Sequence, residues 1–276
     1  MTTDALPRDE AILDLFERLA LDAGRAVMAV YATDFAAAAK ADASPVTAAD
    51  HAAEAIILAG LREALPGVPC VAEEEVAAGR VPEIGDGAFI LVDPLDGTRE
   101  FVSRNGDFTV NIALVRDRVP VVGVVYAPAR DTLYSGRPGA AFAIPTADGR
   151  ISGARRTIRV RAPGSPLAIV ASRSHLTPET AAFIDRFPGA ETVSVGSSLK
   201  FCLLASGEAD LYPRFGRTME WDTAAGDAVL RAAGGRVTLP DGSPFLYGKR
   251  NQADDVDFAN PSFVADVGEA VEAFRS

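Results

Sequence analysis

The chain has 276 residues, of which 48% are hydrophobic, and its formal net charge is −11. This length and hydrophobic content can bury a sizeable core in one large or two medium domains, which argues against a disordered chain. The strong negative charge repels polyphosphate backbones, so we expect no nucleic-acid polymer as a partner. A small anionic ligand would therefore need local cations or a metal ion.

The cysteines and the N-terminal segment bear on the compartment. Cys70 and Cys202 are the two cysteines, and they lie far apart without metal-ligand spacing, so we expect reduced core thiols. Residues 1–10 lack a basic segment followed by an apolar one, and no stretch reaches the roughly 18 apolar residues that span a bilayer. These features predict a soluble cytoplasmic protein without a transmembrane segment. They do not determine its oligomeric state, for which we expect a monomer or a homodimer.

Apolar residues at helical spacing predict two helices near the N-terminus. The first runs from about Ile12 to Val30, and the second opens at Thr47 and ends before Pro66. Several strands are predicted to follow, at residues 68–72 and 88–92, in a hairpin of 108–115 and 119–126, and at 133–135 and 140–144.

A segment rich in Gly, Pro, Arg and Asp between Pro145 and Pro166 predicts a domain boundary. We expect an α+β domain over residues 1–155 and an α/β domain over 156–276. In the second part, strands predicted at 167–171, 192–195, 210–212 and 236–239 alternate with helices opening near Thr177, Ser197 and Asp222. This alternation predicts an α/β layer with a mixed sheet.

The most informative segment is residues 93–98 (Asp-Pro-Leu-Asp-Gly-Thr), directly after an apolar run. Pro94 lacks an N–H and biases Asp93 toward an extended conformation, so we expect the strand to end here. Gly97 and Thr98 would then turn the chain into a helix whose free N–H groups hold an anion. The pattern indicates a site for metal and phosphate. An ordinary Asp-Gly turn is the alternative.

Residues 93–98 resemble the signature of the lithium-sensitive, magnesium-dependent phosphomonoesterases related to inositol monophosphatase. Residues 72–74 (Ala-Glu-Glu) and 221–226 (Trp-Asp-Thr-Ala-Ala-Gly) match the same family, in the expected order. Further segments resemble its 3'(2'),5'-bisphosphate nucleotidase branch, at residues 99–101, 104–111, 172–175, 196–201 and 211–216. The resemblance extends from about Lys40 to Phe263. It implies a layered αβαβα sandwich with the active site between two domains.

The resemblance also implies two or three Mg²⁺ ions. Glu73, Asp93 and the Leu95 carbonyl would hold one ion, while Asp93, Asp96 and Asp222 would hold a second. Oxygen ligands of this kind are the ones that Mg²⁺ prefers. Each residue has a structural alternative: Glu73 could be one of three solvated acids at 73–75, and Asp222 could be a first-turn acid or N-cap of its helix.

The catalytic pair implied by the resemblance is Thr98 and Asp50, which would orient the attacking water. The reaction would be in-line attack by a metal-activated water, without a covalent phosphoenzyme. Backbone N–H groups of Gly97 and Thr98 would hold phosphate oxygens. As an alternative, Thr47 and Asp50 fit a capping box in which the acid is only structural.

Substrate contacts implied by the resemblance come from the second domain. His175 would contact the adenosine moiety, and Ser197, Lys200 and Arg214 would hold the second, 5' phosphate. Inositol monophosphatases lack this polar set. The alternatives are a helix-capping Ser197, a surface Lys200 and an ion-paired Arg214.

Together these matches imply a magnesium-dependent phosphomonoesterase that converts 3'-phosphoadenosine 5'-phosphate, a small-molecule nucleotide bisphosphate, to AMP and phosphate. Two rivals stay open. One is an inositol or sugar monophosphatase of the same fold, and the other is a non-catalytic regulatory member.

Overall fold

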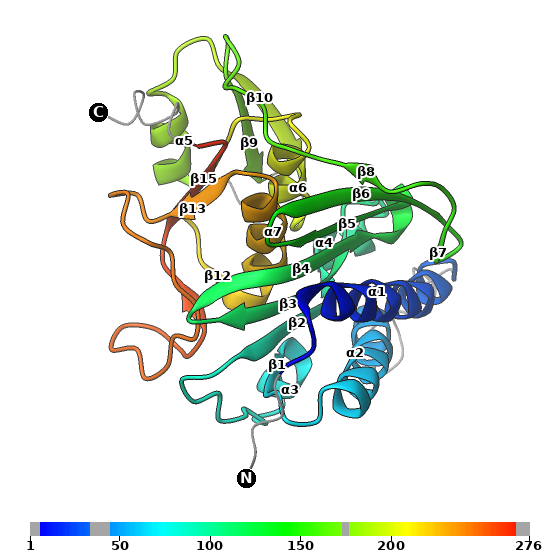
Figure 1. Cartoon of the computed structure of the whole chain (residues 1–276). Coiled ribbons are helices and arrows are strands. Elements are labelled where there is room, and N and C mark those ends of the chain that lie inside the picture. Colours follow the sequence, from blue (N-terminus) through cyan, green and yellow to red (C-terminus); the bar gives the residue numbers. More distant parts are fainter. Residues whose placement is uncertain (1–5, 34–44, 173–176, 269–276) are drawn as a thin grey trace.

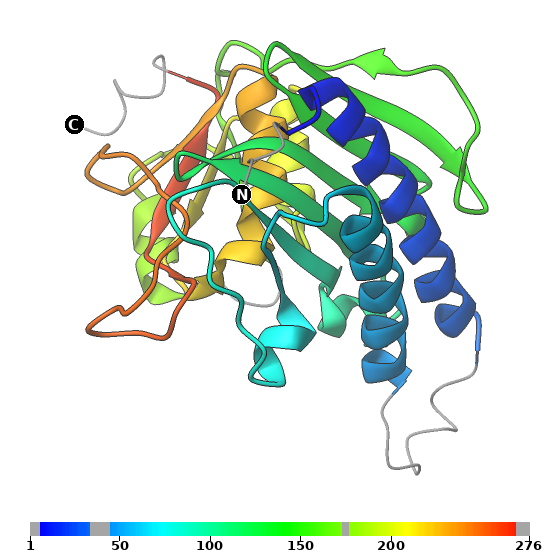
Figure 2. The ribbon, with the colours of Figure 1, turned by 60° about the horizontal axis from the view of Figure 1, so that its bottom comes forward.

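The computed structural model describes residues 6–33, 45–172 and 177–268, and it consists of alternating helical and sheet layers (Figure 1). Helices α1 (Asp9–Tyr31) and α2 (Pro45–Ala64) lie side by side on one face of the first sheet (Figure 2). Helices α6 (Leu199–Ala205) and α7 (Glu220–Ala232) lie between the first and second sheets, and α5 (Pro178–Ile184) contacts the second. The predicted αβαβα sandwich is confirmed.

The first sheet has the strand order β1-β2-β3-β4-β5-β6-β7, with β8 paired to β6. Strands β1 and β2 are parallel, and the other pairs are antiparallel, including the predicted hairpin of β3 and β4. The strands are β1 (Cys70–Ala72), β2 (Phe89–Asp96), β3 (Thr109–Arg116), β4 (Val119–Ala127), β5 (Thr132–Arg137), β6 (Ala140–Ala147), β7 (Arg150–Ile151) and β8 (Arg156–Thr157). Short helical segments connect them: α3 (Glu73–Ala77), α4 (Thr98–Val102) and η1 (Pro128–Arg130).

Successive residues of the first sheet face two different cores, as the twofold period of a strand requires. On β3, Ile112 and Leu114 pack toward α1 and α2, whereas Ala113 and Val115 belong to the core shared with α6 and α7. The predicted apolar stripe of α1 is buried in the first of these cores. Odd-numbered positions of β3 therefore face α7.

The second sheet is mixed, as predicted, with the strand order β10-β9-β11-β15-β13. Strands β10, β9 and β11 are parallel, and β15 is antiparallel to both of its neighbours. Its strands are β9 (Ala168–Ser172), β10 (Glu191–Val195), β11 (Leu211–Arg214), β13 (Arg236–Thr238) and β15 (Phe263–Asp266). Strand β15 was not predicted, and neither was the small pair of β12 (Thr218–Met219) and β14 (Ala259–Asn260).

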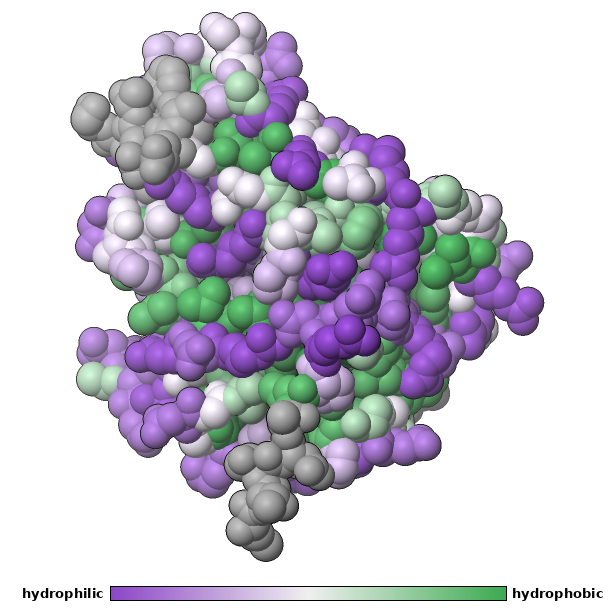
Figure 3. Space-filling model, in the orientation of Figure 1, coloured by the Kyte–Doolittle hydropathy of each residue, from purple (hydrophilic) through white to green (hydrophobic). Residues whose placement is uncertain are grey.

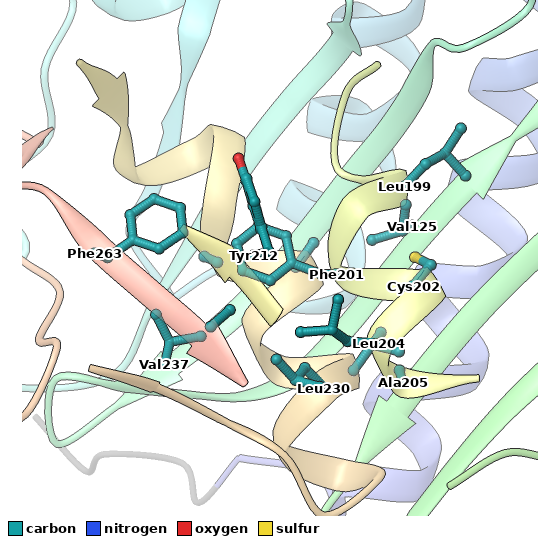
Figure 4. Close-up of a cluster of buried hydrophobic side chains, with 14 of the residues drawn as sticks. Val125, Leu199, Phe201, Cys202, Leu204, Ala205, Tyr212, Leu230, Val237 and Phe263 are labelled. Atoms are coloured by element: carbon teal, nitrogen blue, oxygen red, sulfur yellow. The ribbon is translucent and has the colours of Figure 1, made fainter. Parts of the chain in front are cut away.

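Helix α7 packs closely on the first sheet because two strands carry glycine beneath it. A Cβ on Gly123 would lie 2.6 Å from the Ala225 carbonyl oxygen, and one on Gly136 would lie 2.8 Å from Val229 Cα. On its other side, α7 shares a core with α6 and the second sheet. Figure 4 shows this core, with Val125 from the first sheet, Phe201 from α6 and Phe263 from β15.

This core contains residues from both predicted domains. The domain boundary between residues 155 and 156 stays a prediction. Cys202 is buried in that core, Cys70 is half-buried, and both are free thiols. Among the described residues, no helix is long and apolar enough to cross a membrane. On the face shown in Figure 3, hydrophilic and hydrophobic residues are interleaved.

Candidate active site

Strand β2 carries two acidic side chains past Pro94, so the prediction that the strand ends at this proline was wrong. The strand continues to Asp96, with Asp93 opposite Asn111 and Asp96 opposite Thr109. Between these pairs, Pro94 and Leu95 on β2 lie opposite the single residue Val110 on β3, which is a bulge, a place where proline is tolerated in a sheet. Strand β1 pairs only as far as Val92, so the missing N–H of Pro94 breaks no bond to β1.

The chain turns directly after β2, as expected. Gly97 has φ 92°, a left-handed conformation that glycine adopts without strain, and α4 begins at Thr98. A Cβ on Gly97 would lie 3.0 Å from the Asp107 carbonyl oxygen. Within the bulge, Asp93 Oδ1 accepts a hydrogen bond of 3.0 Å from the Leu95 N–H. The backbone of this segment is thus fixed by its own polar groups.

The three consecutive acids that begin α3 have different surroundings. Glu73 lines a cavity, whereas Glu75 pairs with Arg80 at 2.7 Å, and Glu74 lies 3.7 Å from the His51 ring nitrogen. The alternative of three equivalent solvated acids is therefore wrong.

Asp222 both caps its helix and lines the same cavity. Its Oδ2 accepts a 2.8 Å hydrogen bond from the N–H of Met219, which is the N-cap residue of α7. Asp222 is also one of the residues that line the cavity. The capping role that we considered as an alternative is thus present, and it engages one carboxylate oxygen. The two roles do not exclude each other.

The cavity has a volume of about 290 Å³ and lies between the two sheets. It brings together ten of the residues that the sequence singled out: Glu73, Asp93, Leu95, Asp96, Gly97, Thr98, Ser197, Lys200, Arg214 and Asp222. Asp50 does not line it. His175 lies outside the described residues, as do Lys40 and the side chain of Ser172.

The carboxylates of the cavity repel one another. Burial is the main cause that raises the pKa of Glu73 to about 7, with further contributions from the charges of Asp50 and Asp96. Burial and the charge of Asp96 raise the pKa of Asp222 to about 8. Burial, followed by the charge of Glu73, raises the pKa of Asp93 well above its usual range. A bound cation would relieve the repulsion within this cluster of buried acids.

The same groups fit a magnesium site. Among the described residues, no three His, Cys, Asp or Glu side chains are arranged to hold a metal ion on their own. Mg²⁺ prefers hard oxygen ligands and usually completes its shell of a few carboxylates with water and substrate phosphate. The carboxylates that line the cavity are hard oxygen ligands, and their mutual repulsion would be relieved by a cation. Both properties are consistent with magnesium binding.

Asp50 lies on α2, behind the cavity. It is 4% exposed, and burial together with the charges of Glu74 and Glu54 raises its pKa to about 7. Helix α2 begins at Pro45, so Thr47 lies inside the first turn and the predicted capping box of Thr47 and Asp50 was wrong. The proline favours the earlier start because its fixed φ suits the first helical positions.

Cationic side chains lie at the end of the cavity next to the second sheet. Lys200 is 6% exposed, so the alternative of a surface lysine was wrong. Burial lowers its pKa to about 8, although the charge of Asp96 opposes this shift. Arg214 Nε and Nη2 donate to the carbonyl oxygens of Gly216 and Arg217, each at 3.2 Å.

Ser197 partly takes the role of its predicted structural alternative, a helix cap: its Oγ accepts a 3.5 Å hydrogen bond from the N–H of Leu199, the first residue of α6. The N-cap of α6 is Ser198, and Ser197 precedes it with φ 48°, in the left-handed region that side chains rarely adopt. Strain of this kind is common where a loop forms a binding site.

Sequence reasoning missed several residues of this region. Arg99, Arg217 and Thr218 line the cavity, and Asn111 and Ser198 form hydrogen bonds behind it. Arg99, Asn111 and Ser198 lie in segments that carried the family resemblance, at residues 99–101, 104–111 and 196–201, but no role was assigned to them. Asn111 gave a further signal, since it is an amide in an otherwise apolar run of a buried strand. Arg217 and Thr218 needed the tertiary structure.

Comparison with known proteins gives consistent results. A model of the inositol monophosphatase family matches residues 9–265. The 3'(2'),5'-bisphosphate nucleotidase CysQ of Escherichia coli is 45% identical over 254 residues, which cover 91% of this chain and 98% of the relative. The protein of that name from Buchnera aphidicola is 39% identical over 256 residues, covering 92% and 93%.

Solved structures with similar names are also similar to this chain. The crystal structure of CysQ from Bacteroides thetaiotaomicron superposes with a TM-score of 0.79 at 38% identity and covers 93% of this chain and 98% of that one. The inositol monophosphatase from Anabaena has a TM-score of 0.73 at 26% identity and covers 96% and 94%.

Proposed function

We propose that this chain, which belongs to the inositol monophosphatase family, is a magnesium-dependent nucleotidase that converts 3'-phosphoadenosine 5'-phosphate to AMP and phosphate. It is an enzyme, a phosphatase of the family's type. One observation carries the finer proposal: a single cavity has buried acids at one end and the cations Lys200 and Arg214 at the other. Acids suit magnesium and the reacting phosphate, and cations suit a second phosphate.

The acids would hold the metal ions as follows. Glu73, Asp93 and the Leu95 carbonyl would bind one ion, and Asp93, Asp96 and Asp222 a second. When bound, magnesium would neutralise phosphate charge and acidify a water molecule. Four carboxylates and two divalent ions are formally neutral, so a phosphate dianion meets no net repulsion.

The chain's own groups would bind and orient the reacting phosphate. The N–H groups of Gly97 and Thr98 stand at the beginning of α4, where helix N–H groups have no partner within the helix. The Thr98 hydroxyl would orient the attacking water. Asp50 does not line the cavity, so its carboxylate would act through Thr98, and contacts between α2 and α4 support this.

The second phosphate would lie near Ser197, Lys200 and Arg214. Lys200 would act as a point charge. Arg214 would add the positive charge of its guanidinium, which the carbonyls of Gly216 and Arg217 hold in place through Nε and Nη2. The nearness of Lys200 to Asp96 indicates that this lysine lies between the two phosphate positions, so it would contribute to both.

A phosphate-release assay tests the proposal. We expect turnover of 3'-phosphoadenosine 5'-phosphate with Mg²⁺, little turnover of inositol 1-phosphate, and loss of activity with a chelator. A lithium titration at fixed Mg²⁺ should lower the initial rate, because a monovalent ion enters an oxygen site with half the charge. Preference for inositol phosphate would favour the rival monophosphatase, and a folded protein inactive on both would favour the non-catalytic rival.

Metal binding should also change stability in a pH-dependent way. Because the folded-state pKa values of Glu73 and Asp222 are raised to about 7 and about 8, the folded protein binds more protons than the unfolded chain between about pH 4 and pH 8. These groups therefore destabilise the metal-free fold increasingly as pH rises through that range. A bound cation offsets the repulsion. We expect saturating Mg²⁺ to raise Tm by about 5 °C or more at pH 8.

Thermal melts with and without Mg²⁺ at pH 5.5 and pH 8 check this expectation. The Mg²⁺-dependent rise should be smaller at pH 5.5, where these two acids are largely protonated. A rise of equal size at both values, or none at pH 8, would contradict it.

A further inference from the structure

Two buried polar residues connect the acids of β2 with the first turn of α7. Asn111 Nδ2 lies 3.4 Å from Asp96 Oδ2 and 3.1 Å from Ser198 Oγ. The Ser198 hydroxyl in turn donates to the backbone carbonyl of Asp222 at 2.6 Å. A continuous chain of hydrogen bonds thus runs from the first sheet, through the beginning of α6, to α7.

Asn111 lies on β3 at a position that suits its place in this chain of hydrogen bonds. It lies directly opposite Asp93 and on the face of the sheet that points toward α7, and it is 1% exposed. The next residues on that face are Ala113 and Val115, both part of the hydrophobic core. Since the Asp96 carboxylate only accepts hydrogen bonds when ionised, the amide NH₂ must be the group that faces it.

This amide is costly for the fold. Asn111 Oδ1 is buried and has no hydrogen-bond partner within the described part of the chain. An unsatisfied buried acceptor destabilises the fold, whereas an apolar side chain would avoid that cost. A role at the site, rather than in the core, accounts for an amide at this position.

We propose that Asn111 and Ser198 are positioning residues that hold Asp96 and Asp222 in the arrangement that Mg²⁺ binding requires. The inference rests on the proposed magnesium site. Burial, followed by the charge of Asp96, raises the pKa of Asp222, so the two carboxylates repel each other when both are ionised. A neutral amide can orient a carboxylate without adding a positive charge that would repel the cation, and hydrogen bonds to ligands commonly tune metal affinity in this way.

Ser198 adds the link to the second ligand. Its hydroxyl accepts from Asn111 and donates to Asp222, so it fixes the first turn of α7 relative to β3. Ser198 also forms hydrogen bonds with Asp96 directly, through its side chain and its backbone. The two residues therefore belong to one network around Asp96, and removal of either side chain should loosen the same constraint.

Titration calorimetry of Mg²⁺ binding, without substrate, tests the proposal. We expect Asn111→Ala and Ser198→Ala each to weaken Mg²⁺ binding about ten- to a hundredfold. The double variant should lose little more than either single variant, because the two act in one chain. At saturating Mg²⁺, kcat should be reduced far less than the Mg²⁺ affinity. Ser206→Ala is the matched control, since its hydroxyl donates to Cys202 O at 2.8 Å at the other end of α6.

The outcomes separate this inference from the proposed function. Unchanged Mg²⁺ affinity in folded Asn111→Ala and Ser198→Ala proteins would overturn the positioning role and leave the metal site intact. If the affinity losses of the two single variants multiplied in the double variant, the two residues would act independently, and the shared constraint would be overturned. A wild-type protein that bound no Mg²⁺ would overturn the inference and the proposed cofactor together. Thermal unfolding of every variant shows whether it is folded.

Discussion

Replacement of Asp93 by Asn should lower turnover by about a hundredfold or more. Asp93 is the buried acid that we propose to bridge both ions, and burial and the charges of Glu73 and Asp96 raise its pKa well above the usual range. The amide keeps the shape but removes a charge from each ion's ligand set. Because it also removes repulsion, the metal-free Asp93→Asn protein should be at least as stable as wild type.

The matched control is Glu74→Gln, which removes the charge of the acid that directly follows Glu73 in the sequence. Glu74 does not line the cavity, and its backbone N–H, which donates to Glu54 at 2.9 Å, is unaffected by the change. Its activity should be largely intact. Steady-state rates and Tm for both variants make the comparison, and activity losses of similar size in the two would contradict the assignment of Glu73 and Asp93.

Replacement of Arg214 by Ala should change the substrate preference. Loss of one charge-assisted contact costs roughly 1.5–3 kcal/mol, or about ten- to a hundredfold in kcat/KM. The loss should fall on 3'-phosphoadenosine 5'-phosphate and spare adenosine 3'-monophosphate, which has no second phosphate. Because remote binding energy can also appear in kcat, the ratio of kcat/KM for the two substrates is the quantity to measure.

Lys200→Ala should lower the same ratio, but with some loss on both substrates, because Lys200 also lies near Asp96. Arg25→Ala serves as the control: Arg25 donates to the Gly149 carbonyl at 2.8 Å, away from the cavity. Arg214 also binds the carbonyls of Gly216 and Arg217. Equal losses on both substrates in a folded Arg214→Ala protein would therefore mean that Arg214 is structural.

Local sequence patterns were sufficient for most elements and for the metal motif. The apolar spacing of α1 and the alternation along β3 and β4 follow from helix and strand periods. Gly97 was assigned to a turn from its residue type, and it has the left-handed conformation there. Strand β15 was missed because the four-residue run Phe263–Asp266, two residues after Pro261, carries no distinct strand pattern by itself. Only its place between β11 and β13 makes it a strand.

Tertiary structure decided what local patterns left open. Pro94 interrupts a strand by itself, but a bulge opposite β3 lets β2 continue to Asp96. Three adjacent acids look alike in sequence, yet only Glu73 lines the cavity, because Glu74 and Glu75 lie against other partners. The physical reason is the distance along the sequence over which each effect acts. Periodicity and turn chemistry act over a few residues, whereas burial and charge in the site depend on segments far apart in the chain.

The link from Asp96 through Asn111 and Ser198 to Asp222 illustrates this difference. Each residue alone has an ordinary explanation, as a strand amide, a helix N-cap or a first-turn acid. Their hydrogen bonds exist because glycines at 123 and 136 let α7 pack closely on the first sheet, which brings α7 within reach of β3. The sequence alone therefore identified the acids that we propose to bind metal, while packing between the two sheets determined how they are held and which cations face them.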